Sequence, residues 1–439
     1  MPRFCTAMFT SITTVLVVSL LTVACVPQST TNNNTNTRTT NTKSKGLKIG
    51  SLLPTTGDLA SVGQQMAGAV TLLVDTINDC GGVNGEQVSL VEVDSQTDPR
   101  AGAAGMTKLA TLDKVGGVVG AFASSVSSAA VSIAVPNKVM LVSPGSTSPI
   151  FTDNSQKGYY KGFWARTAPP DTYQALALAQ LARKKGFTRV STAVINNDYG
   201  VGFEKAFVQA FEKLGGTVVN KYKPVRYDPK AQTFDTEAAS VFARSPEAVI
   251  AVLYAETGSL FLKAAYQQGL TEGVQIMLTD GVKSDSFPKQ VGQTGDGKYI
   301  ISEAVGTVPG SNGKALDALN KLWREKKGNP PGEYAPQVWD AVALLTLAAQ
   351  AAKDNSGLGI SNKIKEVANP PGKEVTDVCQ GLKLLKEGKD INYQGASGNV
   401  DIDENGDVIG VYNVWTVDNN GKIQVIDKVS PNTTVKIRS

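Results

Sequence analysis

The chain has no histidine among its 439 residues. Catalysis by Ser-His-Asp or Cys-His arrangements, zinc sites with histidine ligands and histidine-based pH switches are therefore excluded. The lack of histidine leaves room for an enzyme that uses only carboxylates, but it makes a catalytic function less expected. An excess of one charge sign is also missing, because 43 basic and 39 acidic residues leave a net charge of +4. That balance does not favour nucleic acid as a partner.

The composition argues against two further classes of protein. Apolar residues make up 41% of the chain and charged residues 19%. Such a chain builds ordinary hydrophobic cores, so neither wholesale disorder nor a polytopic membrane protein is expected. At about 100–200 residues per domain, the length suggests two or three domains.

The first 24 residues have the pattern of a secretory signal peptide. Arg3 is followed by an apolar run at 14–24, which is too short to cross a bilayer. Cys25 comes directly after a small residue, as in a bacterial lipobox, and this resemblance implies that it becomes the lipidated first residue of the mature chain. The lipobox prefers leucine where this chain has Thr22, so cleavage near residue 24 without lipidation is the alternative.

A polar segment follows the expected cleavage site. Residues 29–45 are low in complexity and carry no apolar group to bury, which predicts a flexible tether over 25–46. Together with a lipidated Cys25, this tether predicts a protein anchored to the membrane. We therefore expect it in the periplasm or on the outer face of the cytoplasmic membrane.

Two cysteines remain in the expected mature body, because Cys5 leaves with the signal and Cys25 is expected to be acylated. These are Cys80 and Cys379. An even pair in an oxidising compartment allows one disulfide. Two separately buried thiols are the alternative, because the sequence does not give the distance between them.

From residue 47 onward, predicted strands and helices alternate in two series. The first series has strands at 48–53, 88–93, 115–120 and 139–142, with helices at 65–79, 101–113 and 126–134. The second has strands at 190–195, 217–220, 248–253 and 275–278, with helices at 201–214, 233–243 and 257–268. Helices at 313–326 and 336–352 and a β-hairpin over 410–426 follow. This pattern predicts an α/β protein with two doubly wound lobes.

One motif near the C-terminus resembles a metal site but departs from it. Residues 401–407 match the first half of a calcium-binding EF-hand loop, yet the twelfth position is Tyr412, where a bidentate glutamate is required. A polar turn between strands is therefore predicted. Glycine-rich nucleotide-binding motifs are also missing, so no metal and no cofactor is expected.

Hydroxyl groups follow two strands of the first series. Ser124 lies at the start of a predicted helix, and Thr147 lies in the segment 143–148. Hydroxyls and free backbone N–H groups at a helix start bind anions such as a carboxylate, and ligands of doubly wound sheets bind beyond the carboxyl ends of strands. Plain helix capping is the alternative for either segment alone.

The second series places different groups after its strands, namely Tyr199, Tyr254 and Asp280. Two aromatic faces and one carboxylate suit an ammonium group, through charge pairing and cation–π attraction. A carboxylate site in one lobe and an ammonium site in the other predict a free α-amino acid held between the lobes.

Seven segments in order carry a resemblance to a known family: LLPTTGDLASVG, INDCGGVNG, GAFASSVSSA, LVSPGSTSP, NNDYGVGF, TDGV and ASGNVDIDENGDV. Over residues 47–439 the chain resembles the type I periplasmic solute-binding proteins of the Leu/Ile/Val-binding family, the receptors of bacterial amino-acid ABC importers. The resemblance implies carboxylate-binding residues at Ser124 and Thr147, ammonium-binding residues at Gly145, Tyr199, Tyr254 and Asp280, and side-chain pocket residues at Val62 and Tyr334. Because Val62 stands where the family has a tyrosine, a broad range of neutral amino acids is expected in place of a preference for Leu, Ile and Val.

The resemblance also implies a hinge of three strands, with crossings near 166–170, 300–306 and 396–402. Lobe 1 would then hold 47–168 plus 304–398, and lobe 2 would hold 169–303 plus 399–439. A ligand would stabilise the closed form, which would dock as a monomer onto a membrane permease without making or breaking a bond.

Three other classes compete with this interpretation. A receptor for urea or short amides has the same fold, but a neutral amide has no ammonium for Asp280 to pair with. A ligand-sensing module is less favoured than transport, because the secretion signal and tether suit an importer. An enzyme would need a nucleophile or a perturbed acid in the cleft.

Overall fold

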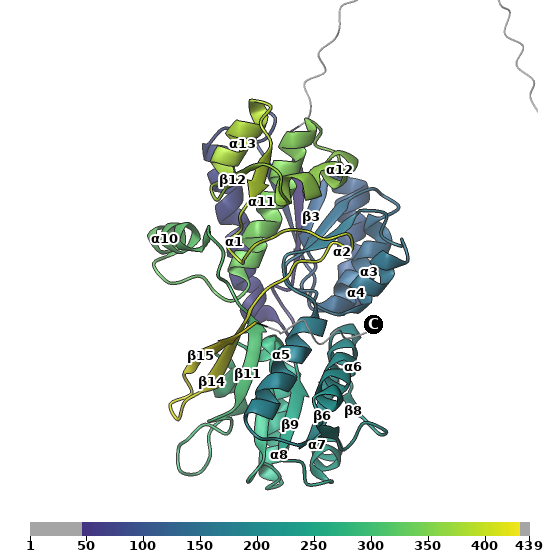
Figure 1. Ribbon diagram of the computed structural model, residues 1–439, viewed down its shortest axis with the longest axis vertical. Coiled ribbons are helices and arrows are strands. Elements are labelled where there is room, and N and C mark those ends of the chain that lie inside the picture. The colour runs from purple at the N-terminus through teal and green to yellow at the C-terminus, as the bar shows by residue number, and fades with distance from the viewer. Residues whose placement is uncertain (1–45, 431–439) are drawn as a thin grey trace, which may run out of the picture. The chain divides into compact units, whose positions relative to one another are not determined.

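The computed structural model describes residues 46–430, and within them two β-sheets each carry helices on their faces (Figure 1). The first sheet and its helices are called the first lobe below, and the second sheet and its helices the second lobe. The predicted signal peptide at 1–24, Cys25 and all but the last residue of the predicted tether lie outside the described residues.

The first sheet confirms the first predicted series. Its five parallel strands have the order β2-β1-β3-β4-β5. They are β1 (Lys48–Leu53), β2 (Ser89–Asp94), β3 (Gly117–Gly120), β4 (Met140–Ser143) and β5 (Trp164–Arg166). The order reverses on the two sides of β1, and such a switch point is where doubly wound sheets bind ligands beyond their strand ends.

Helices cover this sheet on both sides. They are α1 (Ala60–Asp79), α2 (Pro99–Thr107) with the π-helical extension Lys108–Asp113, α3 (Ser124–Ala134), α4 (Ile150–Gln156), α11 (Ala335–Ala352), α12 (Gly357–Ala368) and α13 (Val378–Lys386). A small pair of strands, β12 (Lys373–Val375) and β13 (Ile391–Tyr393), lies near α13. Helix α11 is mostly apolar and is buried over residues 335–350, so it forms the centre of this lobe's core.

The second sheet is longer and mixed. Its strands have the order β15-β14-β11-β10-β9-β6-β7, and β8 pairs with β6. They are β6 (Arg189–Ile195), β7 (Thr217–Val218), β8 (Val225–Tyr227), β9 (Ala248–Val252), β10 (Gln275–Leu278), β11 (Val305–Pro309), β14 (Tyr412–Val417) and β15 (Ile423–Val429). The predicted hairpin is confirmed, because β14 and β15 pair antiparallel.

The second lobe has its own set of helices, drawn mostly in teal in the lower part of Figure 1. They are α5 (Asp171–Lys184), α6 (Asp198–Lys213), α7 (Asp235–Phe242), α8 (Ala255–Gln267), the short turn η2 (Asp280–Val282) and α9 (Phe287–Val291). Helix α10 (Leu316–Lys327) follows β11 along the chain.

Strand β11 corrects one part of the predicted lobe limits. It pairs with β10 and β14, so residues 305–309 lie with the second lobe and not, as predicted from residue 304 onward, with the first. The chain leaves the second sheet only after Pro309. There the amides of Asn312 and Gly313 donate hydrogen bonds to the carbonyls of Ser397 and Ala396, so two of the connecting segments pair with each other.

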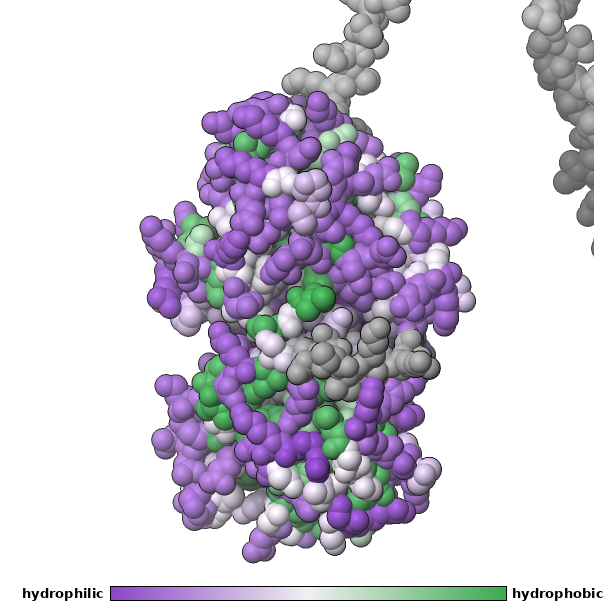
Figure 2. Space-filling view, in the orientation of Figure 1, coloured by the Kyte–Doolittle hydropathy of each residue, from purple (hydrophilic) through white to green (hydrophobic). Residues whose placement is uncertain are grey.

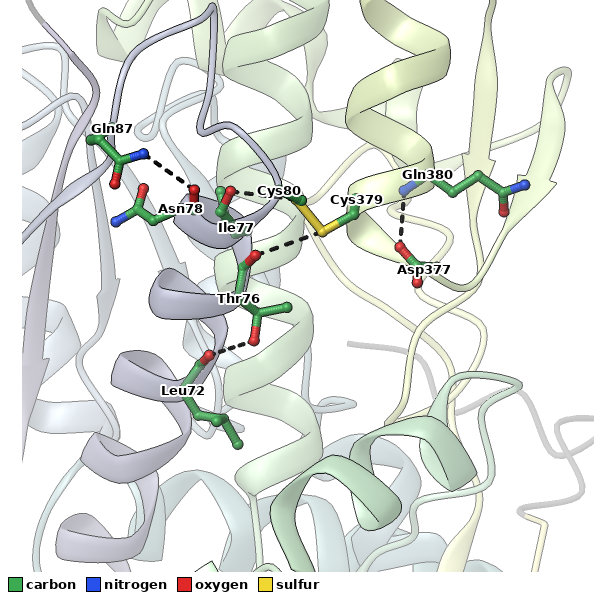
Figure 3. The surroundings of a disulfide bond; sticks show 9 residues. All are labelled: Leu72, Thr76, Ile77, Asn78, Cys80, Gln87, Asp377, Cys379 and Gln380. Atoms are coloured by element: carbon green, nitrogen blue, oxygen red, sulfur yellow. Dashed lines mark hydrogen bonds between the residues drawn. A yellow bond between two sulfur atoms is a disulfide. The ribbon is translucent and has the colours of Figure 1, made fainter. Parts of the chain in front are cut away.

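Cys80 and Cys379 form a disulfide, which decides between the two alternatives left open by the sequence. Their Cα atoms are 5.9 Å apart although 299 positions separate them in the chain. The bond ties the C-terminal end of α1 to the start of α13, and the carbonyl of Thr76 faces the Cys379 sulfur (Figure 3). It closes a loop that includes both lobes, and long loops of this kind restrict the unfolded chain most.

The exposed surface is polar over much of its area. On the face drawn in Figure 2, hydrophilic residues dominate the upper part, and hydrophobic residues show in patches over the lower part. None of the helices between residues 46 and 430 has the length and apolar character needed to cross a membrane.

Candidate functional site

The carboxyl ends of β3 and β4 lead directly into the two hydroxyl-rich segments. Ser124 is the first residue of α3, and its Oγ accepts a hydrogen bond of 3.3 Å from the amide of Ser148. The Oγ1 atom of Thr147 is buried and has no hydrogen-bond partner in the described part of the chain. The two segments are therefore brought together, as predicted, and one hydroxyl is left unused.

Glycine is required within the second segment by a close contact. A Cβ atom added to Gly145 would lie 2.0 Å from Cε2 of Phe122, so no other residue fits without moving the ring. Ser143 fastens the same turn, because its Oγ donates to the carbonyl of Ala121 at 2.6 Å and accepts from the amide of Ser146 at 2.9 Å. The backbone beside Thr147 is thus held by packing and by hydrogen bonds.

A buried ion pair supports this segment from behind. The Nη1 atom of Arg166 donates to the carbonyls of Ser146 and Ser148, at 2.9 and 3.0 Å. The Nε atom of the same side chain pairs with Asp407 at 2.7 Å, and both side chains are almost fully buried. Asp407 belongs to the acidic motif at 401–407, which forms a turn as predicted and fixes the hydroxyl segment through Arg166.

On the opposite side of the site, Asp280 collects hydrogen bonds from three elements. Its Oδ1 accepts from Nε2 of Gln174 at 2.8 Å and from the hydroxyl of Tyr199 at 2.9 Å. Its Oδ2 accepts from the hydroxyl of Tyr334 at 2.7 Å. Gln174 and Tyr199 lie on α5 and α6 of the second lobe, whereas Tyr334 directly precedes α11 of the first. Asp280 therefore joins both lobes.

Aromatic rings surround this carboxylate. The rings of Tyr199 and Tyr254 are stacked with centroids 5.7 Å apart and an interplanar angle of 6°. The ring of Tyr334 meets Phe122 edge to face at 4.7 Å. Tyr334 also has a left-handed backbone with φ of 64°, which is a genuine outlier in a bulky residue. Its position is determined by the contacts of its side chain and not by local preference.

The sequence interpretation missed a second carboxylate at this site. Asp171, the first residue of α5, is fully buried, and neither carboxyl oxygen makes a hydrogen bond of good geometry among residues 46–430, although the Thr147 hydroxyl lies close enough to lower its pKa. Its amide donates to the carbonyl of Thr147 at 2.7 Å, which places it beside the unused hydroxyl. An acid in the first turn of a helix is common, so nothing in the local sequence distinguishes Asp171 from an exposed one.

The two carboxylates influence each other. Burial raises the pKa of Asp171 well above its usual range, and the charge of Asp280 raises it further, while Thr147 and Arg166 act in the opposite direction. Burial also raises the pKa of Asp280, although its hydrogen bonds from Tyr334, Tyr199 and Gln174 lower it. Because Arg166 is already paired with Asp407, a bound cation would favour the ionised forms of both carboxyl groups.

Other contacts hold the lobes against each other. Asp58, in the loop before α1, accepts hydrogen bonds from the amides of Glu256 and Thr257 at the start of α8, at 2.7 and 3.1 Å. Ser128 on α3 donates to Asp198 on α6 at 2.6 Å. The predicted site residues are therefore enclosed between two lobes in contact, and all of them are buried.

Of the two predicted side-chain pocket residues, Val62 lines a cavity of about 400 Å³. Its neighbours there include Ser61 and Gln65 of α1 together with Lys283 and Glu333. The hydroxyl of Tyr334, the second predicted residue, donates to Asp280. The residue before it, Glu333, lines this cavity. No sequence pattern pointed to the polar residues of this cavity as part of a ligand pocket.

Two buried carboxyl groups in one α/β lobe lie next to a hydroxyl-rich segment of the other lobe. This arrangement is that of a two-lobed ligand-binding protein. A family model described as "Receptor family ligand binding region" matches residues 65–420, and the chain belongs to this family. Within it, the chain is a type I periplasmic solute-binding protein of the Leu/Ile/Val-binding family, as the sequence motifs indicated.

Two curated relatives illustrate the range of the family. BasB, the substrate-binding protein of a chemotactic signal transduction system in Halobacterium salinarum, is 27% identical over 361 residues, which cover 81% of this chain and 83% of BasB. The Leu/Ile/Val-binding protein homolog 1 of Brucella abortus is 29% identical over 325 residues, which cover 72% of this chain and 82% of the relative.

Solved structures share the fold. The leucine-binding protein LivK of Thermotoga maritima superposes with a TM-score of 0.73 at 25% identity and covers 88% of this chain and 99% of its own. LivJ of Streptococcus pneumoniae, in complex with isoleucine, has a TM-score of 0.71 at 22% identity, covering 88% and 100%. A Rhodopseudomonas palustris ABC-transporter solute-binding protein in complex with benzoate has a TM-score of 0.68 at 19% identity, covering 88% and 97%.

Proposed function

We propose that this protein is the extracytoplasmic substrate-binding component of an ABC importer, and that it captures α-amino acids between its two lobes. Neutral amino acids of a broad range are the expected ligands. The observation that carries the proposal is the pair of buried carboxylates, Asp171 and Asp280, enclosed between the lobes together with the hydroxyl-rich segment that holds Thr147. The two carboxylates suit the ammonium of a zwitterion, and the neutral hydroxyls of Ser124 and Thr147 suit its carboxylate.

Each end of the ligand has its own partners in this proposal. The ligand carboxylate accepts hydrogen bonds from the hydroxyls of Ser124 and Thr147 and lies near the start of α3, where the helix dipole favours negative charge. The ammonium pairs with Asp280 and Asp171 and donates to the carbonyl of Gly145. The stacked rings of Tyr199 and Tyr254 add cation–π attraction.

Ligand binding favours the closed arrangement because only there do both lobes contribute. Tyr334 and Asp58 of the first lobe reach Asp280 and the start of α8 in the second. A ligand that contacts both lobes shifts the population toward this form by its difference in affinity for the two forms. The closed protein, a monomer held to the membrane by lipidated Cys25, then delivers the amino acid to the permease. No step requires catalysis.

The experiment is a thermal-shift screen of the purified protein against the twenty amino acids, urea, acetamide and benzoate, followed by calorimetry on the ligands found. A ligand that binds only the folded state adds about 2.7 kcal/mol of stability at 100 times its dissociation constant. Stabilisation by amino acids and not by the other three supports the proposal. Stabilisation by urea or acetamide alone would establish an amide receptor, and by benzoate alone a receptor for aromatic acids.

A sensory role is a second candidate, because the relative BasB belongs to a chemotactic system. Both roles use the same binding step and differ in the membrane partner. Uptake of a radiolabelled amino acid by cells with and without the gene separates them, since a pure sensor changes behaviour without changing uptake.

A further inference from the structure

We propose that the cavity beside Val62 selects neutral side chains that end in a carboxamide, over aliphatic side chains of the same size. This inference rests on the proposed function, since it concerns the side chain of the bound amino acid. It narrows the broad range of neutral amino acids that Val62 predicts, because most of the residues that line the cavity are polar.

Two residues of the cavity directly adjoin residues of the proposed ammonium site along the chain. The amide of Lys283 donates to the carbonyl of Asp280 at 3.0 Å, and Glu333 is the residue before Tyr334, whose hydroxyl donates to Asp280. Lys283 and Glu333 both line the cavity together with Val62. An amino acid with its ammonium at Asp280 therefore has this space within reach of a side chain a few carbons long.

The polar groups of the cavity have hydrogen-bonding capacity left over. Lys283 is only 8% exposed, and its Nζ pairs with Oε1 of Glu333. A lysine ammonium has three N–H donors, and this pair uses one of them. The Oγ of Ser61 also lines the cavity and has no hydrogen-bond partner within the described chain. An aliphatic side chain would cover these groups without replacing the water they bind, which costs affinity.

The charges in the cavity select against ionised side chains. Lys283 would attract an acidic side chain, but Glu333 beside it and the exposed Asp285 would both repel one. A basic side chain would be repelled by the buried Lys283 and would compete with it for Glu333. A carboxamide carries an acceptor for Lys283 and a donor for Glu333 in one neutral group. The volume of about 400 Å³ also leaves room for more than a hydroxymethyl group.

Matched ligand pairs test this selection by calorimetry. Asparagine and leucine have nearly the same shape, and glutamine and methionine have side chains of similar length, so each pair compares a carboxamide with an apolar end. We expect the carboxamide of each pair to bind at least tenfold more tightly to the parent protein. The double variant Lys283→Met with Glu333→Leu should reduce this ratio to about one or reverse it.

Lys221 and Glu212 provide the matched control, because they form a partly exposed ion pair on the second lobe, with Glu212 at the opposite end of α6 from Tyr199. The double variant Lys221→Met with Glu212→Leu should leave the ratio unchanged. A thermal melt of each variant shows that it is folded.

Three outcomes would overturn the inference. Leucine and methionine could bind the parent as tightly as the amides, the ratio could survive the Lys283/Glu333 double variant, or aspartate and glutamate could bind more tightly than their amides. Each of these leaves amino-acid binding itself intact. Failure of every amino acid, including alanine, contradicts the proposed function instead, so the two failures are distinguishable.

Discussion

The two sides of the site are built in different ways. On the first-lobe side, a backbone turn is fixed by Ser143, by the lack of a Cβ at Gly145 and by the buried Arg166, and it presents hydroxyls. On the second-lobe side, charged and aromatic side chains from separate helices gather around Asp280. The second-lobe side therefore contributes charge, and the first-lobe side contributes hydroxyls held in a fixed geometry. Substitutions on the two sides should reduce ligand affinity by different amounts.

The largest effect is expected from Asp280→Asn. A largely desolvated ammonium would lose a hydrogen-bonded counter-charge, and removing one partner of a buried charge pair costs about 3–5 kcal/mol. Calorimetry with the best neutral amino acid measures the loss. Asp296→Asn is the matched control, because Asp296 is exposed and pairs only at the surface with Lys298. An unchanged affinity for Asp280→Asn would contradict the ammonium role and favour the amide receptor.

The hydroxyl side should respond more weakly. Ser124→Ala and Thr147→Ala each remove one hydrogen bond to a charged carboxylate, which is worth about 1.5–3 kcal/mol of binding free energy. The unfolding free energy should change little for Thr147→Ala, because its hydroxyl makes no hydrogen bond of good geometry within residues 46–430. Ser132→Ala on the exposed face of α3 is the control. If both site variants bind like the parent, the hydroxyls are only helix caps.

The dependence on pH tests the acidic side of the site without a mutation, because the hydroxyl side has no group that titrates. Burial raises the pKa of Asp280 and of Asp171 above 3.8, and an ammonium pairs with the ionised forms. Ligand binding should therefore release protons, and affinity should rise with pH through the raised pKa values by up to about 1.4 kcal/mol per pH unit for each proton. Above them it should be constant.

The ligand-free protein should show the opposite sign. Because its folded state holds these protons more tightly than an unfolded chain does, this contribution to stability is present below the raised pKa values and is lost as the pH rises through them. Calorimetry in two buffers of different ionisation enthalpy counts the released protons, and thermal melts follow the stability. Proton uptake on binding would contradict the assignment.

The smallest effect is expected from Asp58→Ala, which touches neither end of the proposed ligand. Asp58 caps the start of α8 from the other lobe, and a helix cap is worth about 0.5–2 kcal/mol. This loss should weaken ligand affinity by the same amount, because the contact exists only in the closed form. Small-angle scattering should show a more open ligand-free protein. Asp75→Ala on the exposed face of α1 should change neither quantity.

Much of the fold could be predicted from local patterns. The limits of β1 and β10 agree with the predicted strands at 48–53 and 275–278, and α11 begins one residue before its predicted start. Buried faces of strands and helices produce continuous apolar runs or apolar residues at helical spacing. These patterns repeat along each element, so they can be recognised from the local sequence. Strands of three residues, such as β5 and β13, carry too few repeats to be recognised and were not predicted.

The sequence by itself determined which chemical groups the predicted site contains. They are hydroxyls after two strands of the first series, and tyrosines and an acid after strands of the second, with no histidine anywhere in the chain. Chain order along a doubly wound sheet brings such strand ends to one edge, so their meeting could be expected. The tertiary structure alone decided which side chains complete the site. Asp171, Asp58, Lys283 and Glu333 look like ordinary surface charges in the sequence, and β11 looks like part of the first lobe. Burial, hydrogen bonding and strand pairing of these residues depend on partners distant in the chain, and no local pattern records such partners.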